Sequence, residues 1–503
     1  MASMRSVLRE LANRRAVRIA ALAALPILLC IATVLGVRVY DSLTGPPLEP
    51  WHTFVPEELS VAEIDGTDWQ GYLDAEEAIF QAMKVEVTDR LPAEDQVPEN
   101  RYFEGSALYP GKFATNWNRS YELAPEGVPT GAAVLLHGLT DSPYSMRHFA
   151  EHYRNMGFLA VVPRMPGHGT VPGGLTEVEW EEWMATTRLA VREAIHKAGP
   201  FVPLHIVGYS NGGALALKYT LDTLDRPEDQ RLPKPDRLVL VSPMIGVSAY
   251  ARFAGLAGLP AIFPAFVKAS WLSLLPEYNP FKYNSFPVNG ARQSYQLTTA
   301  LQRQIGNVAR SGKIADLPQI LTFQSIVDAT VNVGALINVL YAQLPANDSE
   351  LVLFDINRAA EFGPLLNKGA EGLMRQMMPP AERRYRSTII SNVGPLTAEV
   401  AEHVTEAGTV AEHSRALRLY YPEDTYSMSH LSLPFPVKDS LYGENPNPDE
   451  NFGIHLGRLA WHGEENVLVV PPGSLLRVTS NPFFPFMLER IDGMIDSFAR
   501  TGS

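Results

Sequence analysis

Short apolar runs follow one another from residue 132 onward, with helix-like segments between them. The runs typical of buried strands are residues 132–136, 158–163, 204–207, 238–241, 320–323 and 351–356. Apolar strands that alternate with helices are typical of parallel sheets covered on both faces. The pattern therefore predicts an α/β fold with a mostly parallel central sheet and helices on both faces, in which residues 351–356 form the last central strand.

Helical spacing of apolar residues marks the segments between and after these runs. Residues 73–85 have such spacing, and residues 483–498 are expected to form a closing helix. A further helix is predicted to begin at a capping box formed by Thr176 and Glu179, and to end at Gly199.

The strand pattern is interrupted twice within a domain that we expect to cover residues 119–503, beginning with a strand at 119–123. Residues 246–314 are rich in aromatic side chains and are predicted to form a helical cap, in which most aromatics pack against one another. Residues 358–416 are expected to be a second insertion, which separates the last strand from His430.

The N-terminus carries an uncharged run of 19 residues, 19–37, long enough to cross the hydrocarbon core of a bilayer as a helix. Five arginines precede the run and only Arg38 follows closely, so the positive-inside rule places the N-terminus in the cytoplasm. Residues 1–40 are thus predicted to be a cytoplasmic N-terminus and a single-pass transmembrane anchor. Residues 41–118 are a linker and N-terminal extension, and the main domain is extracytoplasmic, as for a bacterial inner-membrane protein facing the periplasm or the cell exterior. The alternative is a cleaved signal peptide, which the length of the run and the missing A-x-A site disfavour.

Composition restricts the possible partners. The chain of 503 residues has a net charge of −13, and its first 40 residues hold six arginines and one glutamate. The rest therefore carries 36 basic and 54 acidic residues, which argues against binding to nucleic acid. Cys30 is the single cysteine, so neither a disulfide within the chain nor a cysteine metal site is expected in the soluble part.

The motif Gly208-Tyr209-Ser210-Asn211-Gly212 follows an apolar run and precedes a small, helix-competent segment. A strand, a sharp turn and a helix form the setting in which the serine of G-x-S-x-G becomes a nucleophile. We expect both glycines to be required, because side chains at these positions would clash in the turn. Ser210 is the candidate nucleophile.

A serine nucleophile needs a base, and the base needs an orienting carboxylate; in this architecture the chain order is serine, acid, histidine. Asp328 follows the strand at 320–323 and is the candidate acid, with a helix N-cap as the alternative role. Asp316 precedes that strand and Asp355 lies inside another, so both fit the position less well.

Five histidines follow Asp328. His430 lies in a polar loop after an apolar run and is the candidate base, with His462 beside Gly463 as the runner-up. His403 and His413 lie in acidic, helical-looking sequence and are expected to be solvated.

The oxyanion of a tetrahedral intermediate needs two backbone N–H donors. The candidates are Asn211, directly after the nucleophile, and Leu139, in the loop after the first core strand. His137 and His168 precede the serine and are expected to pack within their loops.

These motifs resemble those of the α/β-hydrolase superfamily, within the branch of monoacylglycerol lipases, bacterial carboxylesterases and serine aminopeptidases. The resemblance rests on His-Gly-Leu-Thr at 137–140, Pro-Gly-His-Gly at 166–169, Gly-Tyr-Ser-Asn-Gly-Gly at 208–213 and Asp328, and covers about residues 119–323. It implies the α/β-hydrolase fold, Ser210 as nucleophile, Asp328 as acid, and Leu139 and Asn211 as oxyanion donors. The chain departs from the family at the histidine, because His430 lies 102 residues after the acid instead of about 30.

The resemblance implies a serine hydrolase that cleaves carboxylic esters through an acyl-enzyme intermediate, without cofactor or metal. The aromatic residues of the expected cap favour a small-molecule ester with an apolar acyl group. An aminopeptidase or amidase would use the same triad and remains an alternative, as does a non-catalytic binding or scaffold protein of the envelope.

Overall fold

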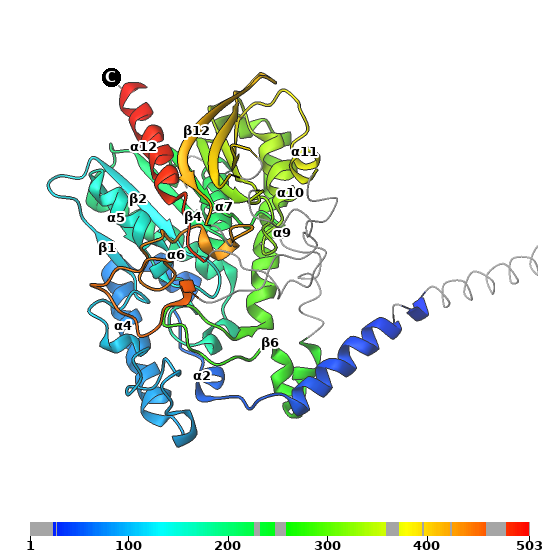
Figure 1. Cartoon of the computed structure of the whole chain (residues 1–503). Helices are drawn as coiled ribbons and strands as arrows, with labels where there is room; N and C mark the ends of the chain where they lie inside the picture. Colours follow the sequence, from blue (N-terminus) through cyan, green and yellow to red (C-terminus); the bar gives the residue numbers. More distant parts are fainter. Residues whose placement is uncertain are drawn as a thin grey trace, which may run out of the picture.

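The structure is a computed structural model. It describes residues 24–26, 28–225, 232–246, 258–358, 372–394, 397–422, 425–458 and 479–501. In this part of the chain a sheet of ten strands has the order β1-β3-β2-β4-β5-β8-β9-β10-β11-β12 (Figure 1). The strands are β1 (Tyr121–Leu123), β2 (Gly131–Leu136), β3 (Phe158–Val162), β4 (Leu204–Tyr209), β5 (Arg237–Val241), β8 (Gln319–Ser325), β9 (Glu350–Phe354), β10 (Arg386–Asn392), β11 (Glu399–Thr405) and β12 (Glu412–Tyr420).

The central strands are parallel, as the apolar runs predicted. Neighbours from β3 to β10 run parallel, whereas β1, β11 and β12 join antiparallel. Every residue of β2, β3 and β4 is buried. This burial explains the uninterrupted apolar sequence, because neither face of these strands meets water.

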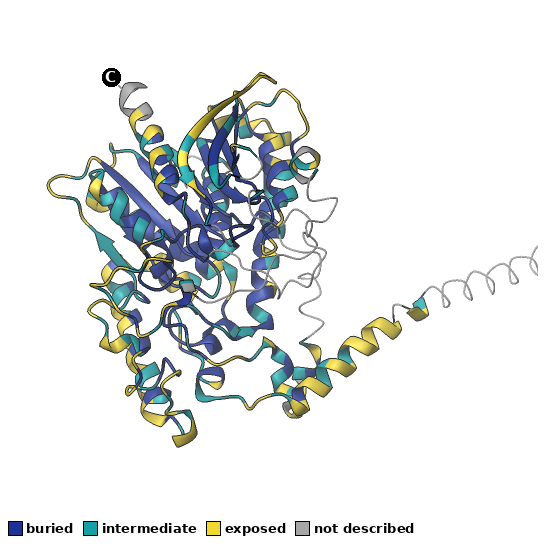
Figure 2. Cartoon of the chain, in the orientation of Figure 1, coloured by how far each residue is buried: buried dark blue, intermediate teal, exposed yellow. Residues whose placement is uncertain are grey.

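Helices cover both faces of the sheet (Figure 2). One face packs on α6 (Trp180–Ala198), α7 (Asn211–Asp225) and α9 (Val288–Arg310), and the other on α5 (Arg147–Asn155) and α12 (Phe484–Thr501). Successive side chains of a strand point to opposite faces, so Val134 of β2 lies in the first cluster and Leu135 in the second.

The expectation that residues 351–356 form the last central strand is wrong. β10 pairs in parallel with β9, Ser387 facing Leu351, and β11 and β12 continue the same sheet. These strands lie toward the open edge, so they contain many polar and charged residues and lack the continuous apolar run of a central strand. β12 is mostly exposed, as its yellow colour in Figure 2 shows, and charged edge strands resist pairing with other chains. His403 and His413, expected in helical sequence, lie in β11 and β12.

The start of α6 also differs from the prediction. Glu179 is the N-cap, in a capping box with Glu182, whereas Thr176 ends the 3-10 turn η5 (Pro172–Thr176) and donates to the Gly173 carbonyl oxygen at 2.6 Å. The helix ends at Gly199 as expected, where φ is +99°.

The N-terminal extension packs against the domain through α3 (Val61–Gly66) and α4 (Trp69–Glu86), which includes the helix predicted at 73–85. Arg164, directly after β3, is 1% exposed and forms two bonds with Glu58, at 2.7 and 2.9 Å. Its Nε donates to Glu76 at 3.2 Å. Residues 58–86 are therefore tied to the core by a buried cation.

The region expected to form a cap is divided between two environments. Residues 247–257, with Tyr250 and Phe253, lie outside the described part. The following elements are η8 (Leu259–Ile262), η9 (Pro264–Ser270), and the hairpin of β6 (Trp271–Ser273) and β7 (Phe286–Pro287). In contrast, α9 buries Leu297, Leu301 and Ile305 in the main core.

One helix of the described residues, Ala24–Thr44, is long and apolar enough to cross a membrane, with a mean hydropathy of 1.7. It projects away from the domain (Figure 1). Residues 1–23, which include the beginning of the predicted run, lie outside the described part. By length and composition, this helix fits either a membrane anchor or a signal sequence.

Candidate active site

Ser210 occupies the sharp turn between β4 and α7 with a φ of +54°, a conformation that costs energy for any residue with a side chain. A Cβ at Gly208 would overlap the Gly212 carbonyl oxygen, and one at Gly212 would overlap that of Leu136. The two glycines are therefore required by close backbone approach, as the sequence predicted.

Backbone bonds from the neighbouring strand hold this turn in place. The Ser210 N–H donates to the Val241 carbonyl oxygen at 2.9 Å, and the Ser210 carbonyl accepts from Met244 N–H at 2.9 Å. The serine is thus positioned by β4 and by the segment that follows β5, so its strained conformation is supported by both.

Asp328 and His430 are 102 residues apart in sequence, but His430 Nδ1 lies 2.7 Å from Asp328 Oδ2. His430 begins the short turn η14 (His430–Ser432), and Asp328 lies in the loop after β8. The same carboxylate accepts from Gln324 Nε2 at 2.9 Å and from the Val331 N–H at 3.1 Å. The helix N-cap in this region is Asn332, so the alternative role of Asp328 as that cap does not apply.

The electrostatics of Asp328 keep it ionised. Burial alone would raise the pKa of this carboxyl, but the neighbouring His430 and the hydrogen bonds from Val331 and Gln324 together lower it below its ordinary value. An ionised acid that accepts from Nδ1 fixes the histidine tautomer and leaves Nε2 as the nitrogen that can accept a proton.

Ser210 and His430 line the same cavity, whose volume is about 450 Å³. The loop Gly138-Leu139-Thr140 forms a second wall, and part of residues 282–294 forms a third. Leu139 is therefore at the cavity, and Asn211 is buried as the first residue of α7.

The other candidates have different surroundings. Asp355 pairs with Arg358 at 2.9 Å, and Asp316 lies in the turn η10 (Lys313–Asp316) before β8. His403 lies 3.1 Å from the Glu412 carboxylate on the edge strands. His462 is outside the described part of the chain.

His137 and His168 lie within their loops, as expected. His137 Nδ1 donates to the Gly138 carbonyl oxygen at 2.9 Å, and Nε2 accepts from Met165 N–H at 3.1 Å. Burial lowers the pKa of His137 to about 3 and that of His168 well below its ordinary value. Both rings are neutral at physiological pH, and each ring nitrogen of His137 already has a hydrogen-bond partner.

Sequence reasoning missed Lys282, whose side chain lines the cavity and lies 3.5 Å from the Leu139 carbonyl oxygen. Among the described residues that line this cavity, no Asp or Glu is present, and Lys282 is the one Lys or Arg. Nothing in the local sequence marks this lysine, because only the fold of the 271–287 hairpin brings it beside the 138–140 loop.

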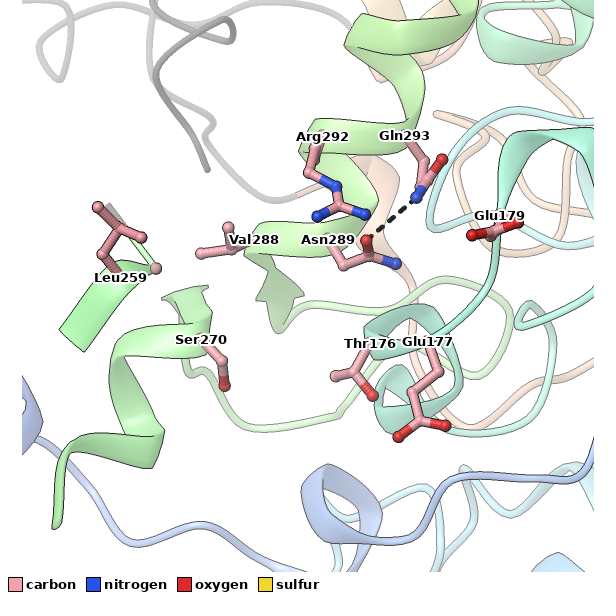
Figure 3. A pocket seen from close by; sticks show the side chains of 10 residues that line it. Thr176, Glu177, Glu179, Leu259, Ser270, Val288, Asn289, Arg292 and Gln293 are labelled. Carbon is pink, nitrogen blue, oxygen red and sulfur yellow. Dashed lines mark hydrogen bonds between the residues drawn. The ribbon is translucent and has the colours of Figure 1, made fainter. Parts of the chain in front are cut away.

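A second hollow of about 520 Å³ lies on the other side of the first turns of α9 (Figure 3). Val288, Asn289 and Arg292 line it, whereas Ala291 and Ser294 of the same helix line the cavity with Ser210. None of the predicted catalytic residues lines this hollow. Among the described residues, no group of three or more His, Cys, Asp or Glu side chains is placed to hold a metal ion.

The mostly parallel sheet, its helices on both faces and the serine turn between β4 and α7 define an α/β-hydrolase fold. Residues 127–355 match the model of the family described as serine aminopeptidase, S33. Over these residues the chain resembles the α/β-hydrolase superfamily, and within it the branch of monoacylglycerol lipases, carboxylesterases and serine aminopeptidases.

Individual relatives match over limited stretches. A thermostable monoacylglycerol lipase of Bacillus sp. (strain H-257) is 32% identical over 92 residues, which are 18% of this chain and 35% of the relative. Phospholipase YtpA of Bacillus subtilis (strain 168) is 26% identical over 151 residues, 29% of this chain and 54% of the relative. The chain thus matches about half or less of the length of these relatives.

Among solved structures, the monoacylglycerol lipase of Paleococcus ferrophilus is 18% identical, with a TM-score of 0.33 over 45% of this chain and 84% of that one.

Proposed function

We propose that this chain is a serine hydrolase that cleaves carboxylic esters through an acyl-enzyme intermediate, with Ser210 as nucleophile, His430 as base and Asp328 as acid. The observation that carries the proposal is the 2.7 Å contact between His430 Nδ1 and Asp328 Oδ2, together with the cavity that His430 and Ser210 share. This arrangement provides each part that a weak hydroxyl nucleophile needs.

In the proposed reaction, His430 Nε2 takes the Ser210 hydroxyl proton as Oγ attacks the ester carbonyl carbon. The N–H groups of Leu139 and Asn211 stabilise the resulting oxyanion, each contributing on the order of 10²–10³ in rate. The C–O bond to the leaving alcohol then breaks, and the alcohol receives the proton from His430. Water repeats the sequence on the acyl-enzyme and releases the acid, so no cofactor or metal takes part.

The charge of the cavity favours an ester over the aminopeptidase alternative. Recognition of a peptide's N-terminal ammonium calls for a carboxylate exposed to the cavity. The described residues that line the cavity include Lys282 and no Asp or Glu, and the carboxylate of Asp141, which interacts electrostatically with Lys282, is buried behind this lining. Met244, Phe286, Ala291 and Leu431 add apolar surface. Each methylene buried on such surface contributes about 0.8 kcal/mol, so we expect an apolar acyl group.

The test is covalent labelling of the purified full-length protein by a fluorophosphonate probe, with Ser210→Ala as the matched control. We expect labelling of the wild type alone and turnover of p-nitrophenyl esters that depends on acyl-chain length. Turnover of aminoacyl amides without ester turnover would assign the chain to the aminopeptidase alternative.

A non-catalytic scaffold is the remaining alternative. The strained conformation of Ser210 argues against it, since such strain costs about 1–3 kcal/mol and has no use without chemistry. A folded protein that the probe does not label would favour the scaffold.

We further propose that the N-terminal helix is an uncleaved anchor and that the domain is extracytoplasmic. The arginine asymmetry supports this topology. A bond from Arg38 Nη2 to the Ala269 carbonyl oxygen, at 3.2 Å, supports retention of the helix, because cleavage after the apolar run would separate the helix from the domain it contacts.

A reporter that works only outside the cytoplasm is expected to be active when it is fused after Ser503, because the chain would cross the membrane once. A reporter that works only in the cytoplasm is expected to be inactive at the same position. Paired phosphatase and fluorescent-protein fusions check this expectation. Activity of the cytoplasmic reporter would refute the topology, and a mature N-terminus beyond residue 40 would identify a signal peptide.

A further inference from the structure

Exposed large apolar side chains are concentrated beside the end of the N-terminal helix. Outside that helix, the described residues include five of them within residues 259–275, while six others are scattered over the rest of the domain. The five are Leu259, Phe263, Val267, Leu272 and Leu275, with exposures from 38% to 64%. Such a concentration on a soluble domain marks a contact surface for a partner.

Hydrogen bonds hold this segment against the last turns of the helix. Arg38 donates to the carbonyl oxygens of Ala269 and Trp271, and Lys268 Nζ donates to the Gly45 carbonyl oxygen at 2.8 Å. Figure 1 shows the helix meeting the domain at this segment. The apolar segment therefore lies where the helix would leave a bilayer.

The last turns of the helix continue the apolar character beyond the uncharged run. Tyr40 and Leu43 are 66% and 64% exposed, although Arg38 has already ended that run. Tyrosine and basic side chains at the end of a membrane helix are typical of the headgroup region, and Lys268 adds a positive charge beside it. The occupant that fits both elements is a lipid bilayer surface.

The same segment is connected to the wall of the catalytic cavity. Ser285 Oγ donates to the Leu275 carbonyl oxygen at 2.9 Å and accepts from the Leu275 N–H at 3.0 Å. Trp271 of β6 pairs with Pro287 of β7, and Phe286, the residue before Pro287, lines the cavity. A bilayer in contact with residues 259–275 would therefore lie next to the hairpin that forms part of the cavity wall.

We propose that residues 259–275 and the last turns of the helix form one membrane-docking surface. This surface holds the 282–286 wall of the cavity at the lipid headgroups, and esters with apolar acyl groups reach Ser210 from the bilayer. The inference rests on the proposed anchor and hydrolase activity, and it adds the surface on which the substrate is presented.

The first test measures contact directly, with the full-length chain in phosphatidylcholine vesicles. Phe263→Cys and Phe201→Cys, each in a Cys30→Ser background, carry an environment-sensitive fluorophore. Phe201 is a matched control, because it is 98% exposed and precedes β4, at the strand end opposite Ser210. We expect a blue shift and quenching by brominated phosphatidylcholine at position 263 only; water-like emission at both positions would overturn the proposal.

The second test measures the consequence. The double variant Phe263→Ser/Leu275→Ser is expected to hydrolyse a soluble short-chain ester at the wild-type rate and a vesicle-borne long-chain ester roughly tenfold more slowly. Equal rates on vesicle-borne ester would contradict docking. If the wild type does not hydrolyse the soluble ester, the proposed hydrolase activity is refuted. The fluorescence test would still report on the membrane-docking surface.

Discussion

Replacing His430 with alanine is expected to lower kcat/KM for ester hydrolysis by roughly 10⁴- to 10⁶-fold, because Ser210 then has no base. The contact between His430 and Asp328 is the structural basis of this expectation. His462→Ala, the runner-up from the sequence, is expected to retain near-wild-type turnover. The measurement is steady-state hydrolysis of a soluble ester by the detergent-purified full-length variants.

His403→Ala is the matched control, since this histidine contacts Glu412 on the edge strands and lies away from the cavity. It should leave turnover unchanged. If His430→Ala retains activity and His462→Ala loses it, the assignment of the base is wrong. Far-UV circular dichroism of each variant separates loss of chemistry from loss of folding.

Replacing Arg164 with methionine is expected to lower the free energy of unfolding by about 3–5 kcal/mol. The substitution leaves the carboxylates of Glu58 and Glu76 buried without their cation. Both carboxylates belong to the N-terminal extension, so we expect the destabilisation to arise where the extension packs beside the end of β3. Urea unfolding of the full-length protein in detergent measures it.

Arg188→Met provides the matched control, because Arg188 also joins the domain to the extension, through a pair with Asp65 at 2.6 Å. Asp65 is 39% exposed, and pairs open to solvent contribute about 0.2–1 kcal/mol. An effect of Arg164→Met as small as that expected for Arg188→Met would show that residues 41–118 are a tether that contributes little to the folded domain.

Local chemistry was sufficient to predict the centre of this molecule. The strands at 132–136, 204–207 and 238–241 are buried on both faces, so their sequences are apolar at nearly every position and are recognisable one by one. The turn at Ser210 is equally local, because Gly208 and Gly212 are required by backbone atoms within a few residues or on the adjacent strand.

The edge of the sheet was not predictable in the same way. β10 to β12 mix polar, charged and apolar residues without a regular period, and β12 is largely exposed. Such sequences are stable as strands because a preceding strand already offers its unpaired backbone groups. Their pairing is thus a consequence of the folded sheet and not of their own composition.

By itself, the sequence determined the sheet's parallel centre, the serine turn, and the chain order in which an acid and a histidine should follow. The tertiary structure decided which side chains meet: it brings His430 to Asp328 across 102 residues, and Lys282 to the loop at Leu139 across 143. The catalytic roles of these residues stay predictions. The physical reason is the distance along the chain over which each effect acts. Backbone strain and strand burial depend on residues that are close in sequence or on an adjacent strand. A cavity is formed by loops whose separation depends on every strand between them.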